Sequence, residues 1–352
     1  MVDRASYLSF LAERGYREEE VLPIVDLTRL PDDGEAAALL QLLATGAKND
    51  PLAALVSTLV SEQWNVNRLI EPINNSVQGH FATGNKVFPG VFPTRSFNGQ
   101  SVRREGGYLV LLDTGCMELH EAAAGIFASL WHTKRKAVVL AEILNDYRER
   151  RLPKLETYDP PGLRGPGSYD RIIFSSRLTN AGQQFVLAHE HAHVALGHSD
   201  IGTTRAFSAA GDTIAVKAHE DEFAADLFAT EALVRGVRGK ADAEIMIACF
   251  GPFLTLGLGL LLEEFREAAP PESTHPAAFA RLARITTYLT AHYAQYAKLG
   301  LEFLEIVGGA GAKLGYQFST TVPDAEVGYQ LIRERLAPRT RLVDRLMFWR
   351  RR

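Results

Sequence analysis

The segment that most constrains this chain of 352 residues runs from Phe185 to His198 and reads FVLAHEHAHVALGH. It contains the motif H-E-x-x-H at His189, Glu190 and His193. A helix turns by about 100° per residue, so residues four apart lie on the same face. His189 and His193 can therefore direct two imidazole nitrogens at one zinc ion, with Glu190 beside the water on that ion. The alternative is a buried helix that carries its histidines by chance.

The neighbouring residues predict where this helix begins and ends. Asn180 is a suitable N-cap, with Gln183 three residues later as in a capping box. Gly197 is a natural C-terminal stop. His191 lies off the face shared by the motif histidines, and we expect it at the surface or beside a ligand. His198 is expected to be a polar residue just past the helix end and not a ligand.

A third ligand is expected because a catalytic zinc ion takes three protein ligands and keeps one position for water. The segment from Ala218 to Val234 reads as a strong helix, and Glu222 and Asp226 lie four residues apart within it. We expect Glu222 to be the third ligand, with Glu220 as the runner-up. Asp226 can accept the outer N–H of a ligand histidine. The alternative is an exposed acidic helix.

Two short apolar segments, Tyr108–Leu112 and Arg171–Phe174, are predicted to be strands. In peptidases of the zincin type, an edge strand beside the zinc helix pairs with extended substrate, and both segments are candidates for that strand. The region from Ile70 to Gly107 is rich in glycine, proline and asparagine. It predicts a long loop or a set of short irregular strands that could line a cleft.

The run from Ile245 to Leu262 has 18 residues without a charge, which is the minimum for a membrane span. It also contains Pro252 and several glycines, and the chain offers no second charge-free run to return across a bilayer. We therefore favour a buried central helix or a kinked helical hairpin. Membrane association stays open at this point.

Two patterns together resemble a known class of enzymes. H-E-x-x-H followed by a helix bearing E-F-x-A-D resembles the gluzincin metallopeptidases. The segment STHPAAFARLARI, from Ser273 to Ile285, is similar to a stretch in their heat-shock and CAAX-protease branch. The HExAHxxLGH pattern also resembles the cytoplasmic ImmA/IrrE-type and the Lit-like phage-exclusion peptidases. The resemblance covers about Arg171 to Ile285.

The resemblance implies a role for each residue that matches it. His189, His193 and Glu222 would hold zinc, and Glu190 would be the general base. The substrate would be a protein or a peptide. The oxyanion of peptide hydrolysis also needs an electrophile besides the metal. The candidates for that role are His275, which we place first, and His219, Tyr288 and Tyr293.

Charge and cysteine content limit the partners and the compartment. A net charge of -4 gives the chain no global attraction to nucleic acid or to anionic membranes. The C-terminal segment Ile332–Arg352 carries eight arginines among apolar residues. It could make weak contact with a membrane or a partner, and no nucleic-acid motif accompanies it. Two cysteines and an N-terminus without an apolar leader predict a cytoplasmic protein.

These observations predict a mostly helical α+β fold. A zincin-like core with a short mixed sheet beside the active-site helix would occupy residues 101–300. Helical regions would flank it at 1–100 and 301–352. The expected function is a zinc-dependent metalloendopeptidase. The alternatives are a triggered regulatory peptidase of a phage-defence or stress system, and a catalytically silent zinc-binding interaction protein.

Overall fold

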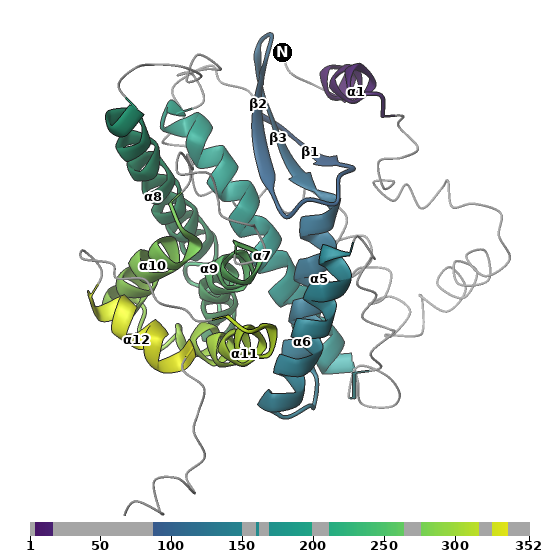
Figure 1. Cartoon of the computed structure of the whole chain (residues 1–352). Coiled ribbons are helices and arrows are strands. Elements are labelled where there is room, and N and C mark those ends of the chain that lie inside the picture. Colours follow the sequence, from purple (N-terminus) through teal and green to yellow (C-terminus); the bar gives the residue numbers. More distant parts are fainter. Residues whose placement is uncertain are drawn as a thin grey trace, which may run out of the picture.

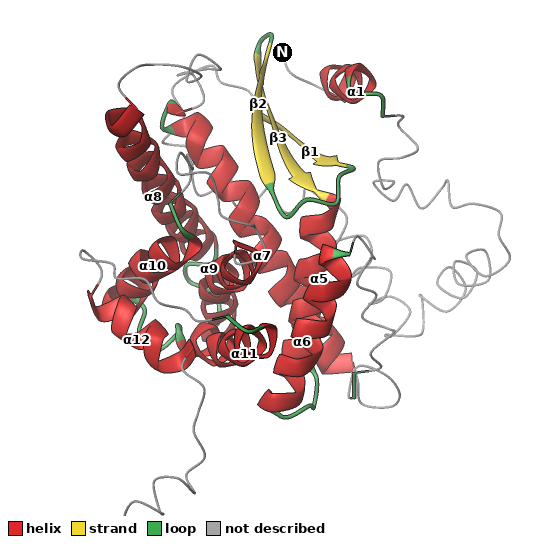
Figure 2. Ribbon diagram, viewed as in Figure 1, coloured by secondary structure: helices red, strands yellow, loops and turns green. Residues whose placement is uncertain are grey.

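The computed structural model describes residues 4–16, 87–149, 160–161, 169–198, 211–263, 276–316 and 326–336. This part of the chain is mostly helical and contains one short mixed sheet, which confirms the predicted fold class (Figures 1 and 2). The strands are β1 (Val87–Phe92), β2 (Gly99–Arg104) and β3 (Gly107–Asp113). The helices are α1 (Arg4–Glu13), α5 (Thr114–Ala128), α6 (Thr133–Arg148), α7 (Tyr169–Ala195), α8 (Gly211–Gly236), α9 (Asp242–Glu263), α10 (Ala278–His292), α11 (Lys298–Leu314) and α12 (Glu326–Leu336).

The sheet has the strand order β1-β3-β2. β1 runs parallel to β3, with Val87 opposite Tyr108, and β2 runs antiparallel to it, with Gly99 opposite Leu112. The predicted strand Tyr108–Leu112 is therefore real and lies within β3. It was wrong as a candidate edge strand, because β3 has a neighbour on each side. In the described sheet the edges are β1 and β2.

Helix α7 is 27 residues long, carries the H-E-x-x-H motif near its C-terminal end, and packs against α5, α8 and α9. Two predictions about its start are wrong, because the helix already includes Arg171–Phe174 and has Asn180 in its interior. Its buried face continues back from Phe185 to Leu178, two helical turns earlier, so packing overrides the local capping signal. At the other end, Gly197 has a left-handed φ of 74°, as expected of a helix stop.

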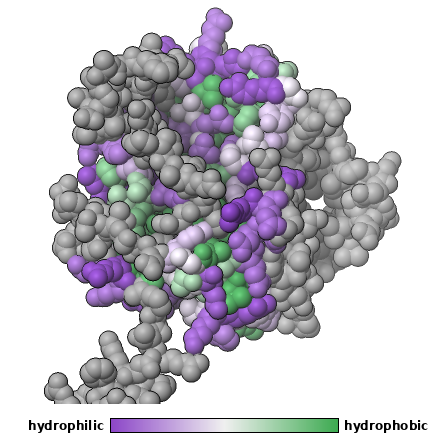
Figure 3. Space-filling model, in the orientation of Figure 1, coloured by the Kyte–Doolittle hydropathy of each residue, from purple (hydrophilic) through white to green (hydrophobic). Residues whose placement is uncertain are grey.

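The apolar run predicted to be a buried helix is a single helix, α9. It passes between α7, α10 and α11, and its Gly251 lies so close to the carbonyl oxygen of Ala181 that a Cβ there would sit 2.4 Å from that oxygen. Among the described helices, α9 is the one long and apolar enough to cross a membrane, and 78% of its most apolar stretch is buried. Figure 3 shows hydrophilic residues over most of the coloured surface, with apolar residues in smaller patches.

Helix α1 is held against the sheet by apolar packing and one hydrogen bond. Phe10 and Leu11 are buried, and the hydroxyl of Tyr7 donates to the carbonyl oxygen of Val91 at 2.5 Å. The rest of the predicted helical N-terminal region, up to residue 86, lies outside the described residues, as does the basic segment after residue 336. The division of the chain at residues 100 and 300 stays a prediction.

Candidate metal centre

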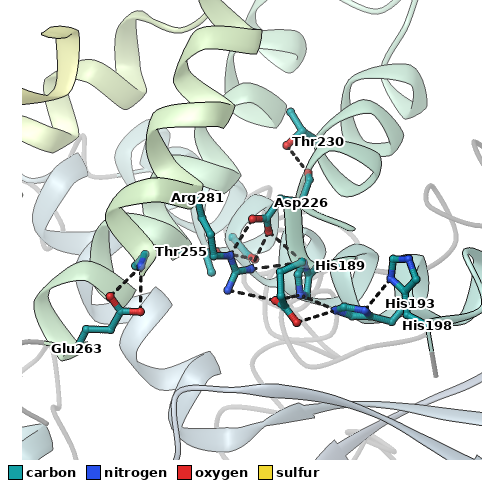
Figure 4. A network of polar contacts seen from close by, with 11 residues as sticks. His189, His193, His198, Asp226, Thr230, Thr255, Glu263 and Arg281 are labelled. Carbon is teal, nitrogen blue, oxygen red and sulfur yellow. Dashed lines mark hydrogen bonds and ion pairs between the residues drawn. The ribbon is translucent and has the colours of Figure 1, made fainter. Parts of the chain in front are cut away.

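Helices α7 and α8 pack side by side and bring His189, His193 and Glu222 together. Figure 4 shows the two histidines next to each other. The Nε2 atoms of the two histidines are 3.1 Å apart. Oε2 of Glu222 lies 3.3 Å from Nε2 of His189, and Oε1 lies 3.3 Å from Nε2 of His193. The spacing that suggested a shared helix face therefore corresponds to a real cluster. Its ligand atoms lie within 4.8 Å of one another.

The chemistry of this cluster fits a divalent metal ion. Two imidazole nitrogens and a carboxylate face one point from two helices, and the side chains of His189 and Glu222 are each only 8% exposed. Three groups that prefer to accept are costly to bring together in a buried place unless a cation or protons lie between them. Two histidines and one glutamate are also a donor set that catalytic zinc sites use.

The outer nitrogen of His189 is held by a buried ion pair. Nδ1 of His189 donates to Oδ1 of Asp226, 3.0 Å away, as expected for this aspartate. Arg281 of α10 donates two hydrogen bonds of 2.7 Å to the same carboxylate, from Nε to Oδ2 and from Nη2 to Oδ1. The side chain of Asp226 is 1% exposed. A donated Nδ1–H leaves the lone pair of His189 on Nε2, directed at the cluster.

The charges of this buried group determine its protonation. Burial alone would raise the pKa of Asp226, but the guanidinium of Arg281 outweighs burial and holds that pKa below its usual value. Burial likewise lowers the pKa of His189, but hydrogen bonds to Asp226 and Glu222 outweigh it and raise the pKa to about 9 without a metal. Asp226 is therefore a carboxylate at neutral pH, able to accept the proton on Nδ1.

The outer nitrogen of His193 has a different neighbour, His198, in the turn after α7. Their Nδ1 atoms are 3.1 Å apart, and Nε2 of His198 lies 3.4 Å from Oδ1 of Asp221 on α8. An imidazole whose Nε2–H faces a carboxylate has its lone pair on Nδ1, so His193 is the donor and His198 the acceptor. His198 thus contacts His193 through the nitrogen that faces away from the cluster, and that it is not a ligand stays a prediction.

Glu190 follows His189 on α7 and lies against strand β2. A Cβ added at Gly99 would lie 2.9 Å from Cγ of Glu190 and 2.6 Å from a methyl carbon of Val186. The strand thus approaches the motif glutamate closely because residue 99 has no side chain. Asp113, at the end of β3, is a buried carboxyl nearby. Burial raises its pKa to about 6, hydrogen bonds such as the one from Ser96 oppose this, and the charge of Glu190 adds to it.

Two other predicted residues of the motif helices lie away from the cluster. Glu220, the runner-up ligand, is 61% exposed and pairs with Arg284 at 3.3 Å. His191 is 1% exposed, so the expectation of a surface position is wrong. Helix α7 is packed on several sides, which buries the face opposite the cluster as well. Burial lowers the pKa of His191 to about 4.

The candidate oxyanion-stabilising residues lie on α8, on α10 and at its end, or outside the described residues. Tyr288 lies two turns after Arg281 on α10 and donates to Glu231 at 3.2 Å. Tyr293 is at the end of the same helix, and His219 precedes Glu222 by about one turn on α8. His275, our first choice, lies outside the described residues. The oxyanion role stays a prediction without an assigned residue.

Sequence reasoning missed Arg281 and the contact made by His198. Arg281 had a signal, because two carboxylates one turn apart on a buried helix face require a nearby cation. The arginines that follow Ser273 were noted only as part of a resemblance, with no partner named. His198 offered no signal for its contact, since the path of the turn after α7 sets its position.

A family model matches the part of the chain that carries this cluster. No curated protein and no solved structure matches the chain. Residues 130–299, just under half of the chain, match the family model described as Peptidase U49. The matched range includes His189, Glu190, His193, Glu222 and Arg281. This part of the chain is thus similar to a family of peptidases, and it contains the whole histidine–glutamate cluster.

Proposed function

We propose that the protein is a zinc-dependent endopeptidase in which His189, His193 and Glu222 hold the ion and Glu190 is the general base. The observation that carries this proposal is the convergence of the three side chains from α7 and α8 at distances of 3.1 to 3.3 Å. The match to a peptidase family model over the same helices supports the choice of reaction.

The chain's own residues supply the proton transfers of peptide hydrolysis. A bound zinc ion polarises a carbonyl group and makes water acidic enough to lose a proton near neutral pH. Glu190, next to a ligand in sequence and half-buried beside β2, can accept that proton and pass it to the leaving amine. The N–H bonds from His189 to Asp226 and from His193 to His198 keep both rings oriented.

Strand β2 is the best place for the substrate backbone. It is an edge strand of the described sheet, and its Gly99 lies against Glu190. An extended peptide that adds to this edge would form main-chain hydrogen bonds with β2 and pass the general base. β2 therefore takes the role for which the sequence suggested Tyr108–Leu112 or Arg171–Phe174. The proposed substrates are proteins or peptides.

Two variants test this function and separate it from silent zinc binding. Glu190→Gln should keep zinc, because residue 190 is not a ligand, and should lose at least a hundredfold in peptidase rate. His193→Ala should lose the zinc itself. The measurements are metal content by atomic emission and a comparison of the proteomes of cells that express wild type or Glu190→Gln. Wild-type protein with zinc but no cleaved substrate in any condition would favour the silent zinc-binding alternative.

A further inference from the structure

Arg281 is placed where it touches nearly every charged group behind the candidate metal centre. Besides its two bonds to Asp226, its Nη1 lies 3.6 Å from Oε2 of Glu222. Its Nη2 lies 3.5 Å from Nδ1 of His189. Nη2 of Arg281 and Nδ1 of His189 both donate to Oδ1 of Asp226, so the two nitrogens lie side by side on one carboxylate oxygen. The arginine side chain is 17% exposed.

The positive charge of Arg281 balances negative charge that α8 places in a buried position. Glu222 and Asp226 lie one turn apart on one helix face, and their side chains are 8% and 1% exposed. Two buried carboxylates this close repel each other, and each loses the solvation that water would give it. A metal ion can balance Glu222, but Asp226 lies behind His189 and needs its own counter-ion. Arg281 supplies that charge, and Asp226 in turn raises the pKa of the guanidinium against burial.

The shape of the guanidinium matters as well as its charge. A planar fork that binds both oxygens of a carboxylate fixes the plane of that carboxylate. Here it keeps Oδ1 of Asp226 within 3.0 Å of His189. The contact of Nη1 with Oε2 of Glu222 leaves Oε1 facing His193. A lysine would keep the charge but could not bind both oxygens in this fixed geometry.

Contacts at the start of helix α10 and its buried side chains fix the position of Arg281. Both carboxylate oxygens of Glu263, at the end of α9, accept from the backbone N–H of Ala278, at 2.8 and 3.0 Å. Phe279 and Leu282, on either side of Arg281 in sequence, are buried. The arginine is therefore carried by a packed helix with a capped first turn.

We propose that Arg281 is a positioning residue for the metal centre, which sets the orientation of both His189, through Asp226, and Glu222. It lies behind the ligands, with its donors directed at Asp226 and Glu222, so it acts through them. The proposal rests on the proposed function, because it takes His189 and Glu222 to be metal ligands.

The test compares two arginines of the same helix. Arg281→Lys removes the fork and keeps the charge. Arg284→Ala is the matched control, because Arg284 lies one turn further on and also pairs with a carboxylate of α8, the exposed Glu220. We expect Arg281→Lys to weaken zinc binding 10- to 100-fold and to change the visible spectrum of the cobalt-substituted protein. Arg284→Ala should stay within threefold of wild type. Zinc affinity is measured by competition with a chromophoric chelator.

A double-mutant cycle with Asp226→Asn separates positioning from a general loss of structure. If Arg281 acts through Asp226, Arg281→Lys should weaken zinc binding much less in the Asp226→Asn protein than in wild type. Equal zinc affinity of Arg281→Lys and wild type would overturn the inference alone. Wild-type protein that binds no zinc would overturn the proposed function and this inference together.

Discussion

The outer nitrogens of the two motif histidines, Nδ1 in each ring, have neighbours of different kinds. His189 donates to Asp226, which is 1% exposed and gripped by Arg281. His193 donates to His198, which faces Asp221, and the side chains of that pair are 13% and 14% exposed. The carboxylate behind His189 is almost fully buried, whereas Asp221 behind His198 is partly accessible to water, which screens its charge more. The two proposed ligands thus have supports in different surroundings.

The difference arises from which helix covers each histidine. Asp221 and Glu222 are neighbours on α8 and point about 100° apart, so one faces the turn after α7 and the other the cluster. Asp226 lies one turn after Glu222, where α10 covers α8 and brings Arg281. The support of His189 is therefore part of the helical core, and the support of His193 belongs to a turn at its margin.

The largest effect is expected from breaking the buried support. Asp226→Ala leaves the guanidinium of Arg281 buried with one of its carboxylates gone. Removal of one partner from a buried ion pair typically costs about 3–5 kcal/mol. The matched change Asp221→Ala should cost under about 1 kcal/mol, because that pair is partly solvated. Urea unfolding of both variants, without metal, measures the difference. Equal destabilisation by the two variants would show that both supports contribute equally to the stability of the fold.

A smaller effect is expected from removing the proposed zinc ion, which would join the two supports at one point. Zinc at about 100 times its dissociation constant should stabilise the fold by about 2.7 kcal/mol, because it binds the folded form. Scanning calorimetry with and without a chelator measures this gain. The gain should vanish in His193→Ala, which lacks one ligand. Identical melting of wild type with and without zinc would contradict the shared metal centre.

The two supports also show how far sequence reasoning reaches. The positions of His189, His193 and Glu222 on common helix faces follow from 3.6-residue periodicity, which is local, and the structure has these side chains together. Their role as ligands stays a prediction. Arg281 lies 55 residues from Asp226, so no local rule pairs them. The one signal that could have been used is that two carboxylates one turn apart on a buried helix face need a cation nearby.

The errors in the predicted fold have the same origin, because they too involve contacts between distant parts of the chain. Asn180 carries a correct local N-cap signal, yet α7 begins at Tyr169 because its buried face extends two turns further back. Arg171–Phe174 has strand-like composition but lies in the first turns of that helix. Strand β3 was predictable from its apolar residues, whereas β1 and the polar β2 lie in the region for which a long loop or short irregular strands were expected. The strand order depends on pairing between distant segments. Tertiary contacts decided each case.

The smallest effect is expected from the support in the turn after α7, which His198 provides. His198→Ala removes the acceptor for Nδ1 of His193, so the ring loses its fixed orientation. We expect about a tenfold loss of zinc affinity, which is about 1.4 kcal/mol. The free energy of unfolding without metal should change by less than 1 kcal/mol, since the site is partly solvated.

Leu196→Ala is the control for His198→Ala. Leu196 lies in the same turn, is 43% exposed and has no polar side-chain atom. If the histidine acts through its hydrogen bond, Leu196→Ala should bind zinc as wild type does. If both variants weaken zinc binding equally, the turn as a whole holds His193 in place. If neither variant weakens zinc binding, α7 alone orients His193. In that case the metal centre requires the support of His189 and not that of His193.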